Sequence, residues 1–472
     1  MFSLMRGATP VIVINKAQIA WDLLQKRGEI YSSRPRLIIA HELLSRGLRG
    51  LTMPYTKQWR TWRKVSQLRC YSAPAIQNTG LNVRAALAYL EHQTLEATIA
   101  LRDFLRAPEQ FATSVAFSIA YGQRTATLED EKYRRNGEAP CFDCMFTWFR
   151  RTTFADMTSE ALLQYPWLMY LPRFMQWFRF RWDEGYGKAE MLYMELLKDV
   201  EDRLKTGIAK ECMATRSLRD QEALGISDVQ LAFAMAAPFA AGIDTAISRF
   251  LWSTLASRRN TPQSKCTMRG VHEELDRVVG RNRLPTFDDQ ASLPCLDTFV
   301  KELNRWQTIT PRGVPHALAA DDVYQGHFIP KGTIIVPNVY TMMKDEETFP
   351  DAMRFSPEGF LKTDDPRMLD FTLSFGFGRR ICPGMHVALQ SLYFFFRQRW
   401  WRPRRFMWAF TVKPAQDETG ATVLPDMNNQ VVSGLTRKPA PFKCVIQPRF
   451  PDVAGMIHKE AAEADETLKA WD

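Results

Sequence analysis

The segment Ser374-Phe-Gly-Phe-Gly-Arg-Arg-Ile-Cys-Pro-Gly384 decides the fold, because it presents one cysteine sulfur at the start of a helix. Cys382 follows a glycine-containing loop and precedes Pro383, which is well tolerated in the first turn of a helix. We expect that helix to run from His386 to Phe396. Free N–H groups and the helix dipole would stabilise a thiolate at Cys382, as would the charge of Arg380. The segment therefore predicts a metal-ligating cysteine, although a cysteine in other surroundings is more often a small buried apolar residue.

The composition is typical of a large globular domain with an apolar core. Of the 472 residues, 46% are hydrophobic and 12% aromatic, and no linker, repeat or low-complexity tract divides them. We therefore expect one domain over residues 1–472. The net charge is +10, but no zinc-finger, repeat or basic–aromatic strand pattern accompanies it. This argues against a nucleic-acid partner and favours a basic face that docks an acidic redox partner or an anionic lipid surface.

The cysteines of this chain predict reduced thiols, because a chain of this length does not need a disulfide framework. Cys141 and Cys144 form a C-x-x-C pair, but no second pair or nearby histidine completes a zinc site, and we interpret the pair as a coincidence. The eight positions are Cys70, Cys141, Cys144, Cys212, Cys266, Cys295, Cys382 and Cys444.

Neither a signal peptide nor a membrane span is expected at the start of the chain. The opening residues run directly into Val11–Ile14, which predicts a strand. The longest apolar run, Leu231–Ile243, is interrupted by Pro238 and ended by Asp244. It is too short to cross a bilayer and predicts a buried core helix.

The rest of the chain predicts a mainly α fold with small β-sheets. Asp322–Asn338 has the turn-punctuated pattern of a hairpin region. Asp228 to about Ala256 predicts one long central helix, and Cys295–Trp306 predicts another. Met191–Leu204 is amphipathic, and so is the stretch that carries Leu87, Leu90 and Leu101.

Three short patterns carry candidate chemistry. Glu302 and Arg305 are three residues apart on a helix, so their side chains can meet, which alone would predict an exposed ion pair worth about 0.5 kcal/mol or less. Ala241-Gly-Ile-Asp-Thr245 places a glycine and an acid inside the central helix, where both cost helix stability. Trp59 and Arg63, four residues apart, share a helix face.

Together these segments resemble the cytochrome P-450 family. Phe375, Gly378, Arg380, Cys382 and Gly384 match its heme-binding loop at every position that the family signature fixes, and the three patterns above resemble its E-x-x-R, A-G-x-D-T and W-x-x-x-R motifs. Two further segments, Tyr31-Ser-Ser-Arg-Pro35 and Phe328-Ile-Pro-Lys-Gly332, are similar to the fungal microsomal branch. The resemblance extends from the first residues to Arg449 and implies a long central helix over a heme, with the cysteine loop near the C-terminus.

The resemblance also implies a role for each candidate residue. Cys382 would be the axial ligand of the iron of heme b, within the loop formed with Phe375, Gly378 and Gly384. Gly242, beside Ala241, would let dioxygen approach the central helix, where Thr245 and Asp244 would deliver protons. The heme propionates would be held by charge-assisted donors, namely Trp59, Arg63, His316 and Arg380. Glu302 and Arg305 would be structural, and Thr308–Val314 would face the distal pocket.

The implied function is that of a heme-thiolate monooxygenase that inserts one atom of dioxygen into a small lipophilic substrate. Electrons would come from NADPH through a separate cytochrome P-450 reductase, because the chain has no glycine-rich dinucleotide fingerprint. Cytochrome b5 is a further implied partner, and the implied location is the cytosolic face of the endoplasmic reticulum membrane.

The chain also departs from the family in three places. The hydrophobic anchor that begins members of this branch is not expected here. Pro357-Glu-Gly-Phe360 lacks the usual third arginine of the E-x-x-R site, for which Arg354 is the candidate substitute. Arg397–Arg405 interrupts an expected apolar helix with five arginines. Two alternatives therefore stay open: a truncated or degenerate member with impaired heme binding, and an enzyme that uses peroxide or rearranges an oxidised substrate.

Overall fold

The computed structural model describes twelve stretches of the chain: residues 1–69, 112–123, 165–256, 265–281, 289, 292–389, 406–423, 426, 428–433, 435–440, 442–453 and 455–456. The predictions for Cys70, Leu87, Leu90, Leu101, Cys141, Cys144 and Arg397–Arg405 lie outside these residues. The helix expected from His386 is described only at its start, where residues 385–389 are helical.

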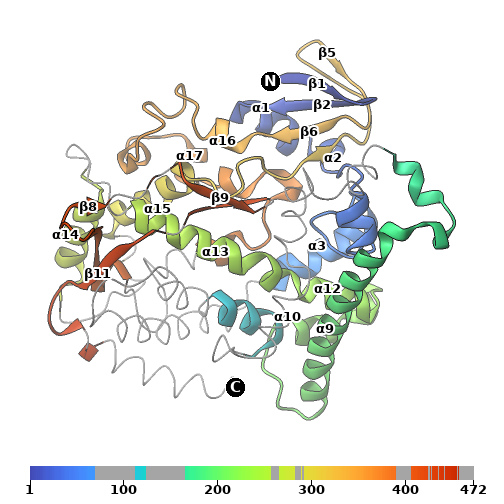
Figure 1. Cartoon of the computed structure of the whole chain (residues 1–472), viewed down its shortest axis with the longest axis horizontal. Coiled ribbons are helices and arrows are strands. Elements are labelled where there is room, and N and C mark those ends of the chain that lie inside the picture. The colour runs from blue at the N-terminus through green and yellow to red at the C-terminus, as the bar shows by residue number, and fades with distance from the viewer. Residues whose placement is uncertain are drawn as a thin grey trace.

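The described chain is mainly helical, with small sheets, as predicted (Figure 1). The longest helix among the described residues is α9, which contains the predicted amphipathic stretch Met191–Leu204. The helices of three or more turns, and those that connect them, are α3 (Lys57–Arg69), α9 (Phe180–Lys205), α10 (Met213–Arg219), α11 (Gln221–Leu224), α12 (Asp228–Met235), α13 (Ala237–Ala256), α14 (Met268–Val278) and α15 (Pro294–Trp306). Shorter helices are α1 (Ala17–Ala20), α2 (Gly28–Tyr31), α16 (Val339–Met342), α17 (Pro366–Leu369) and α19 (Phe406–Ala409).

The largest sheet joins the two strand regions expected from the sequence. Its order is β1 (Phe2–Arg6), β2 (Thr9–Ile14), β6 (Ile334–Pro337) and β3 (His316–Ala317). β2 and β6 run parallel, with Val11 opposite Ile334. The sheet thereby fixes His316, at its edge, against the N-terminal part of the chain. The other strands form the hairpin β4 (Asp322–Tyr324) and β5 (His327–Ile329), the sheet of β7 (Phe410–Gln416), β8 (Thr422–Val423) and β11 (Cys444–Pro448), and the pair β9 (Gln430–Ser433) and β10 (Thr436–Pro439).

The central helix is interrupted, which corrects the prediction of one continuous helix from Asp228. α12 and α13 are separated at Ala236, because Pro238 has no N–H to donate to the preceding turn. α12 begins with a capping box, in which Ser227 accepts from the Gln230 N–H and the Gln230 side chain accepts from the Ser227 N–H. An 18-residue window within this stretch of 29 residues has a mean hydropathy of 1.4, which by length and composition alone would suit a membrane span. Residues toward both of its ends, such as Leu231 and Trp252, nevertheless pack in the largest core cluster, as expected for a core helix.

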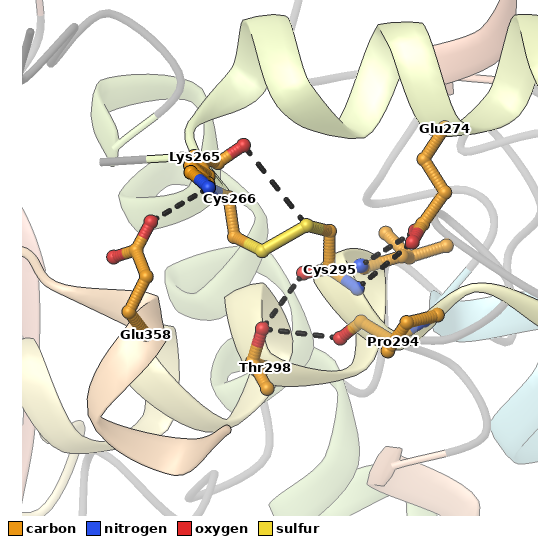
Figure 2. The surroundings of a disulfide bond; sticks show 8 residues. Lys265, Cys266, Glu274, Pro294, Cys295, Thr298 and Glu358 are labelled. Carbon is orange, nitrogen blue, oxygen red and sulfur yellow. Dashed lines mark hydrogen bonds between the residues drawn. A yellow bond between two sulfur atoms is a disulfide. The ribbon is translucent and has the colours of Figure 1, made fainter. Parts of the chain in front are cut away.

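One pair of cysteines is oxidised, so the prediction that all thiols are reduced is wrong for this pair. Cys266, just before α14, forms a disulfide with Cys295, the second residue of α15 (Figure 2). The fold brings the two helix starts together, with the Cα atoms 4.8 Å apart, and chain length gives no information on such proximity. Cys212, Cys382 and Cys444 are not part of a disulfide.

Two carboxylates hold the backbone on either side of this disulfide. Glu274 accepts hydrogen bonds from the N–H groups of Cys295 and Leu296, at 3.1 and 3.2 Å, and thereby caps α15. Glu358 accepts from the Cys266 N–H at 2.7 Å (Figure 2). The disulfide therefore lies in a site that is already ordered by hydrogen bonds.

We expect loss of this disulfide to lower the free energy of unfolding by about 2–4 kcal/mol, because a closed loop of this length restricts the unfolded chain. Denaturant unfolding of the wild type with and without dithiothreitol measures the effect. The Cys266→Ser/Cys295→Ser variant is the control and should unfold at the same denaturant concentration in both buffers. Equal unfolding of the wild type in the two buffers would contradict the prediction.

Candidate active site

The cysteine loop is a tight turn closed by backbone hydrogen bonds. The short helices η8 (Leu373–Phe375) and η9 (Gly378–Arg380) precede Cys382, whose N–H donates to the Phe375 carbonyl at 2.9 Å. Gly378 has a φ of +50°, and a Cβ there would lie 2.3 Å from the carbonyl oxygen of Leu24. Only glycine fits this position, so the loop motif is required for the packing of the loop against η1 (Trp21–Lys26).

The sulfur of Cys382 borders a large cavity. The cavity has a volume of about 380 Å³ and is lined mostly by apolar side chains of α13, the loop after α15 and the cysteine loop. Predicted site residues that line it are Trp59, Arg63, Ala241, Gly242, Thr245, His316, Phe375, Arg380, Cys382 and Gly384. Ile309, Thr310, Gly313 and Val314 also line it, from the segment expected to face the distal pocket. Asp244, Gly378, Glu302 and Arg305 are not among its lining residues.

Burial raises the pKa of the Cys382 thiol, against the expectation that the helix start alone would favour a thiolate. The Gly384 N–H and the Arg63 guanidinium act in the opposite direction but do not outweigh burial. A metal ion bound to the sulfur would deprotonate it, so the anionic ligand requires the metal as well as the loop.

Buried cations gather beside the cysteine loop. Arg380 donates to the carbonyls of Ser32, Gly50 and Met53, at 2.7, 3.2 and 2.7 Å. Its guanidinium lies 4.1 Å from the centre of the Trp59 ring. Burial, and then the charges of Arg34 and Arg63, lower the pKa of Arg380 to about 8. Several positive charges therefore lie close together at this site, where burial limits their solvation.

Arg34 belongs to this group, although the sequence analysis did not assign it a role. It lines the cavity, and it donates to the carbonyls of Leu51, Val314 and Pro315 at 3.0, 3.0 and 2.8 Å. Burial lowers the pKa of Arg34 to about 9. The available signal is its place in Tyr31-Ser-Ser-Arg-Pro35, one of the segments that resemble the fungal branch.

His316 is also buried here. Its Nδ1 lies 2.8 Å from the Tyr31 carbonyl oxygen, so Nδ1 carries the donated proton. Burial lowers its pKa well below the usual value, and Arg34 and Arg380 add to this effect. Among the described residues that line the cavity there is no aspartate or glutamate to balance these cations. The guanidinium donors Arg34, Arg63 and Arg380 thus fit a group that brings its own carboxylates, as the two propionates of a heme would, whereas His316 could donate from Nε2 only after such a carboxylate had caused it to be protonated.

The A-G-x-D-T segment faces the cavity from α13. The Thr245 hydroxyl donates to the carbonyls of Ala241 and Gly242, at 2.8 and 3.1 Å. A Cβ at Gly242 would meet no atom within 4 Å, so the missing side chain leaves open space beside the helix. The hydroxyl is therefore held at the cavity wall, next to a place where the backbone can be approached.

Glu302 and Arg305 form a buried ion pair, not an exposed one. The two parallel bonds, Nε to Oε2 and Nη2 to Oε1, measure 2.6 and 2.7 Å, and the side chains are 1% and 3% exposed. Arg305 also donates to the carbonyls of Met343, Ala352 and Arg354, all within 2.9 Å.

Backbone groups contact the Glu302–Arg305 pair where the usual third arginine of the E-x-x-R site is missing. Glu302 accepts from the Ser356 N–H at 2.6 Å, just before η7 (Pro357–Phe360). Arg354 contributes its carbonyl oxygen to Arg305, as above, while its guanidinium lies 3.9 Å from Asp351. The pair is thus completed through main-chain groups of the segment 352–356.

Comparisons with known proteins agree with this geometry. The family model "Cytochrome P450" matches residues 1–432. A cytochrome P450 monooxygenase of Armillaria gallica is 31% identical over 96% of this chain and 84% of its own, and virE of Hypocrea virens, also named as a cytochrome P450 monooxygenase, is 32% identical over 98% and 81%. A zebrafish cytochrome P450 solved with abiraterone superposes with a TM-score of 0.72, at 20% identity over 95% of this chain and 96% of that one, and shares the fold. The chain therefore belongs to the cytochrome P450 family and is a cytochrome P450 monooxygenase.

Proposed function

We propose that this monooxygenase binds heme b through Cys382 and inserts one atom of dioxygen into a small lipophilic substrate. The observation that carries the proposal is that Cys382 and Thr245 line the same, mostly apolar cavity. Electrons would come from NADPH through a separate reductase, with cytochrome b5 as a second donor. No other function is favoured by a feature of the described residues.

Each residue of the site has a role that follows from its chemistry. When bound, the heme supplies the iron that activates dioxygen. Cys382 would hold the iron, and Arg34, Arg63, Arg380 and His316 would hold the propionates, with Trp59 packed against Arg380. Thr245 would pass a proton from its hydroxyl into the cavity, and Asp244, one residue before it on α13, would resupply that proton. The apolar wall would exclude water from the substrate.

An exposed aromatic segment supports association with a membrane surface. Residues 165–180 lie at the edge of the molecule, before and at the start of α9 (Figure 1). They expose six large aromatic side chains, and Arg173 lies among them with its side chain 76% exposed. Tyrosine and tryptophan favour the interface of a bilayer, and arginine favours anionic headgroups. The exposed aromatic residues are Tyr165, Trp167, Tyr170, Phe174, Trp177 and Phe180. The proposed location is the cytosolic face of the endoplasmic reticulum membrane.

Reconstitution tests the proposed reaction. The heme-loaded chain with reductase, NADPH and dioxygen should oxidise substrates that give a spectral shift on binding, and omission of the reductase should stop turnover. Turnover that needs no reductase and runs on peroxide, or needs no oxidant, would replace the proposed reaction by one of the alternatives from the sequence analysis.

We expect Thr245→Ala to keep the heme spectrum and lower the yield of product per dioxygen consumed by about 10-fold or more, since a positioned proton donor contributes about 10²–10⁴-fold to rate. Parallel measurement of dioxygen consumption, peroxide release and product gives the yield. Thr245→Ser, which keeps the hydroxyl, is the matched control and should retain most of the coupling. Full coupling in Thr245→Ala would contradict the assigned proton transfer.

A further inference from the structure

Arg249 is a buried cation in the wall of the cavity, one helical turn beyond Thr245 on α13. Arg249 is only 5% exposed. One of its nitrogens, Nη1, donates to the carbonyls of Leu303 and Gln307 at 2.8 and 2.9 Å and so caps the end of α15. Within the part of the chain that the structure describes, neither Nε nor Nη2 has an acceptor, and no carboxylate pairs with the guanidinium. The capping role therefore uses one of its three nitrogens.

A second guanidinium adds to the positive charge at this place. Arg437, on β10, donates through Nη2 to the Gln307 side-chain oxygen at 2.6 Å. Burial, and then the charge of Arg437, lower the pKa of Arg249 to about 9, so that Arg249 remains protonated at neutral pH. Two buried cations that share one neutral glutamine favour the binding of an anion.

The heme propionates do not account for this charge. The cations that lower the pKa of Arg380 are Arg34 and Arg63, whereas the one that lowers the pKa of Arg249 is Arg437. Arg249 is therefore not among the charges that lower the pKa of Arg380. A heme has only two propionates, and Arg34, Arg63 and Arg380 already provide donors for them beside the cysteine loop.

Asn304 supplies a second polar group next to Arg249. It follows Leu303, whose carbonyl Arg249 binds, and it lines the same cavity. The residue is 1% exposed, yet neither its amide nitrogen nor its amide oxygen has a hydrogen-bond partner among the described residues. Burial of a polar group without a hydrogen-bond partner is unfavourable. A ligand that accepts a hydrogen bond from the amide nitrogen would remove the part of this cost that comes from that nitrogen.

We propose that Arg249 and Asn304 form a polar subsite that binds the carboxylate of an otherwise apolar substrate. The rest of the cavity suits such a molecule, since side chains such as Phe233, Phe250, Ile309 and Leu435 line it. The ionised carboxylate accepts from Arg249 and from the Asn304 amide, while the hydrocarbon part fills the apolar space. This inference rests on the proposed function, because it names the substrate class of the same site.

Matched pairs of an acid and its primary amide test this subsite. Dodecanoic acid is compared with dodecanamide, and biphenyl-4-carboxylic acid with biphenyl-4-carboxamide, by spectral titration and by calorimetric titration of the heme-loaded chain. Hydrogen bonds to a charged group are worth about 1.5–3 kcal/mol, so the acid of at least one pair should bind about 10- to 100-fold more tightly than its amide. Equal or absent binding of acid and amide in both pairs would overturn the proposal.

Three variants test which residues cause the preference for the acid over its amide. Arg249→Gln can still donate to the carbonyls of α15 but has no charge, and it should abolish the preference for the acid. Arg437→Gln removes a buried charge that does not line the cavity and is the matched control, with a change of about 3-fold or less expected from the longer distance. Asn304→Leu should weaken acid binding several-fold without lowering the midpoint of denaturant unfolding. A loss in Arg437→Gln as large as that in Arg249→Gln would overturn the assignment to Arg249, and unchanged acid binding in Asn304→Leu would remove Asn304 from the subsite.

The spectrum of the reduced, carbon-monoxide-treated protein is recorded on every sample. A wild type without the shifted thiolate band would contradict the proposed function, whereas a wild type with the band but without a preference for acids would contradict the subsite alone. The calorimetric titration reports binding without any spectrum or turnover, so the two failures are distinguishable.

Discussion

Replacing Cys382 by alanine is expected to abolish the red-shifted Soret band of the reduced, carbon-monoxide-treated protein completely. That band requires a thiolate bound to the iron, and Cys382 is the free cysteine, among the described residues, whose side chain borders the cavity. The loop itself should persist, because its closing hydrogen bonds, such as that from the 382 N–H to the Phe375 carbonyl, are made by backbone. The expected result is thus a folded protein that has lost its metal ligand.

Cys212→Ala is the matched control for this experiment. Cys212 is also a buried cysteine at the start of a helix, where its sulfur accepts from the Thr215 N–H at 3.5 Å, but it does not line the cavity. Its replacement should lower stability slightly and leave the band in place. Retention of the shifted band in Cys382→Ala, or its loss in Cys212→Ala alone, would contradict the assignment of the ligand. Heme content, measured after denaturation, separates loss of the ligand from loss of the cofactor.

The cysteine loop could be predicted from the sequence because its chemistry is local. The glycine at position 378, the cysteine and the proline after it act through neighbours in the chain or through one close contact, so a short motif contains most of the information. The same is true of Glu302 and Arg305, which are three residues apart on α15. What the motif did not contain was the burial of the pair, because burial depends on the segment 343–356 that folds over it.

Two features that sequence reasoning missed, the disulfide and the pair of Arg249 and Asn304, depend on distant parts of the chain. Cys266 and Cys295 are 29 residues apart and meet only because two helix starts are packed together. Arg249 and Asn304 lie on different helices, and neither residue belongs to a motif. Helix propensity alone also did not reveal where α12 ends and α13 begins, since Pro238 can be accommodated near the first turn of a new helix.

Replacing Arg305 by methionine is expected to lower the free energy of unfolding by about 3–5 kcal/mol, the usual cost of removing one partner of a buried pair. Methionine fills a similar volume but leaves the Glu302 carboxylate without its counter-charge. It also leaves the carbonyls of Met343, Ala352 and Arg354 without a donor. Glu302 still accepts a hydrogen bond from the Ser356 N–H. One hydrogen bond from a neutral donor cannot replace the two charge-assisted bonds of the guanidinium. Denaturant unfolding and the heme content of the purified protein measure the result.

Arg269→Met is the matched control, because Arg269 and Glu273 form a similarly short ion pair, at 2.8 Å, with side chains 83% and 65% exposed. Water screens this pair, so its loss should change the free energy of unfolding by no more than about 0.5 kcal/mol. Arg305→Lys should rescue little, since a single ammonium cannot replace the planar fork that contacts Glu302 and three carbonyls together. If Arg305→Met were no more destabilising than Arg269→Met, the segment 352–356 would not depend on the pair. In that case the backbone that replaces the missing third arginine would have to be held in place by its own packing, as by Phe355, which contacts Phe299 and Trp306 edge to face.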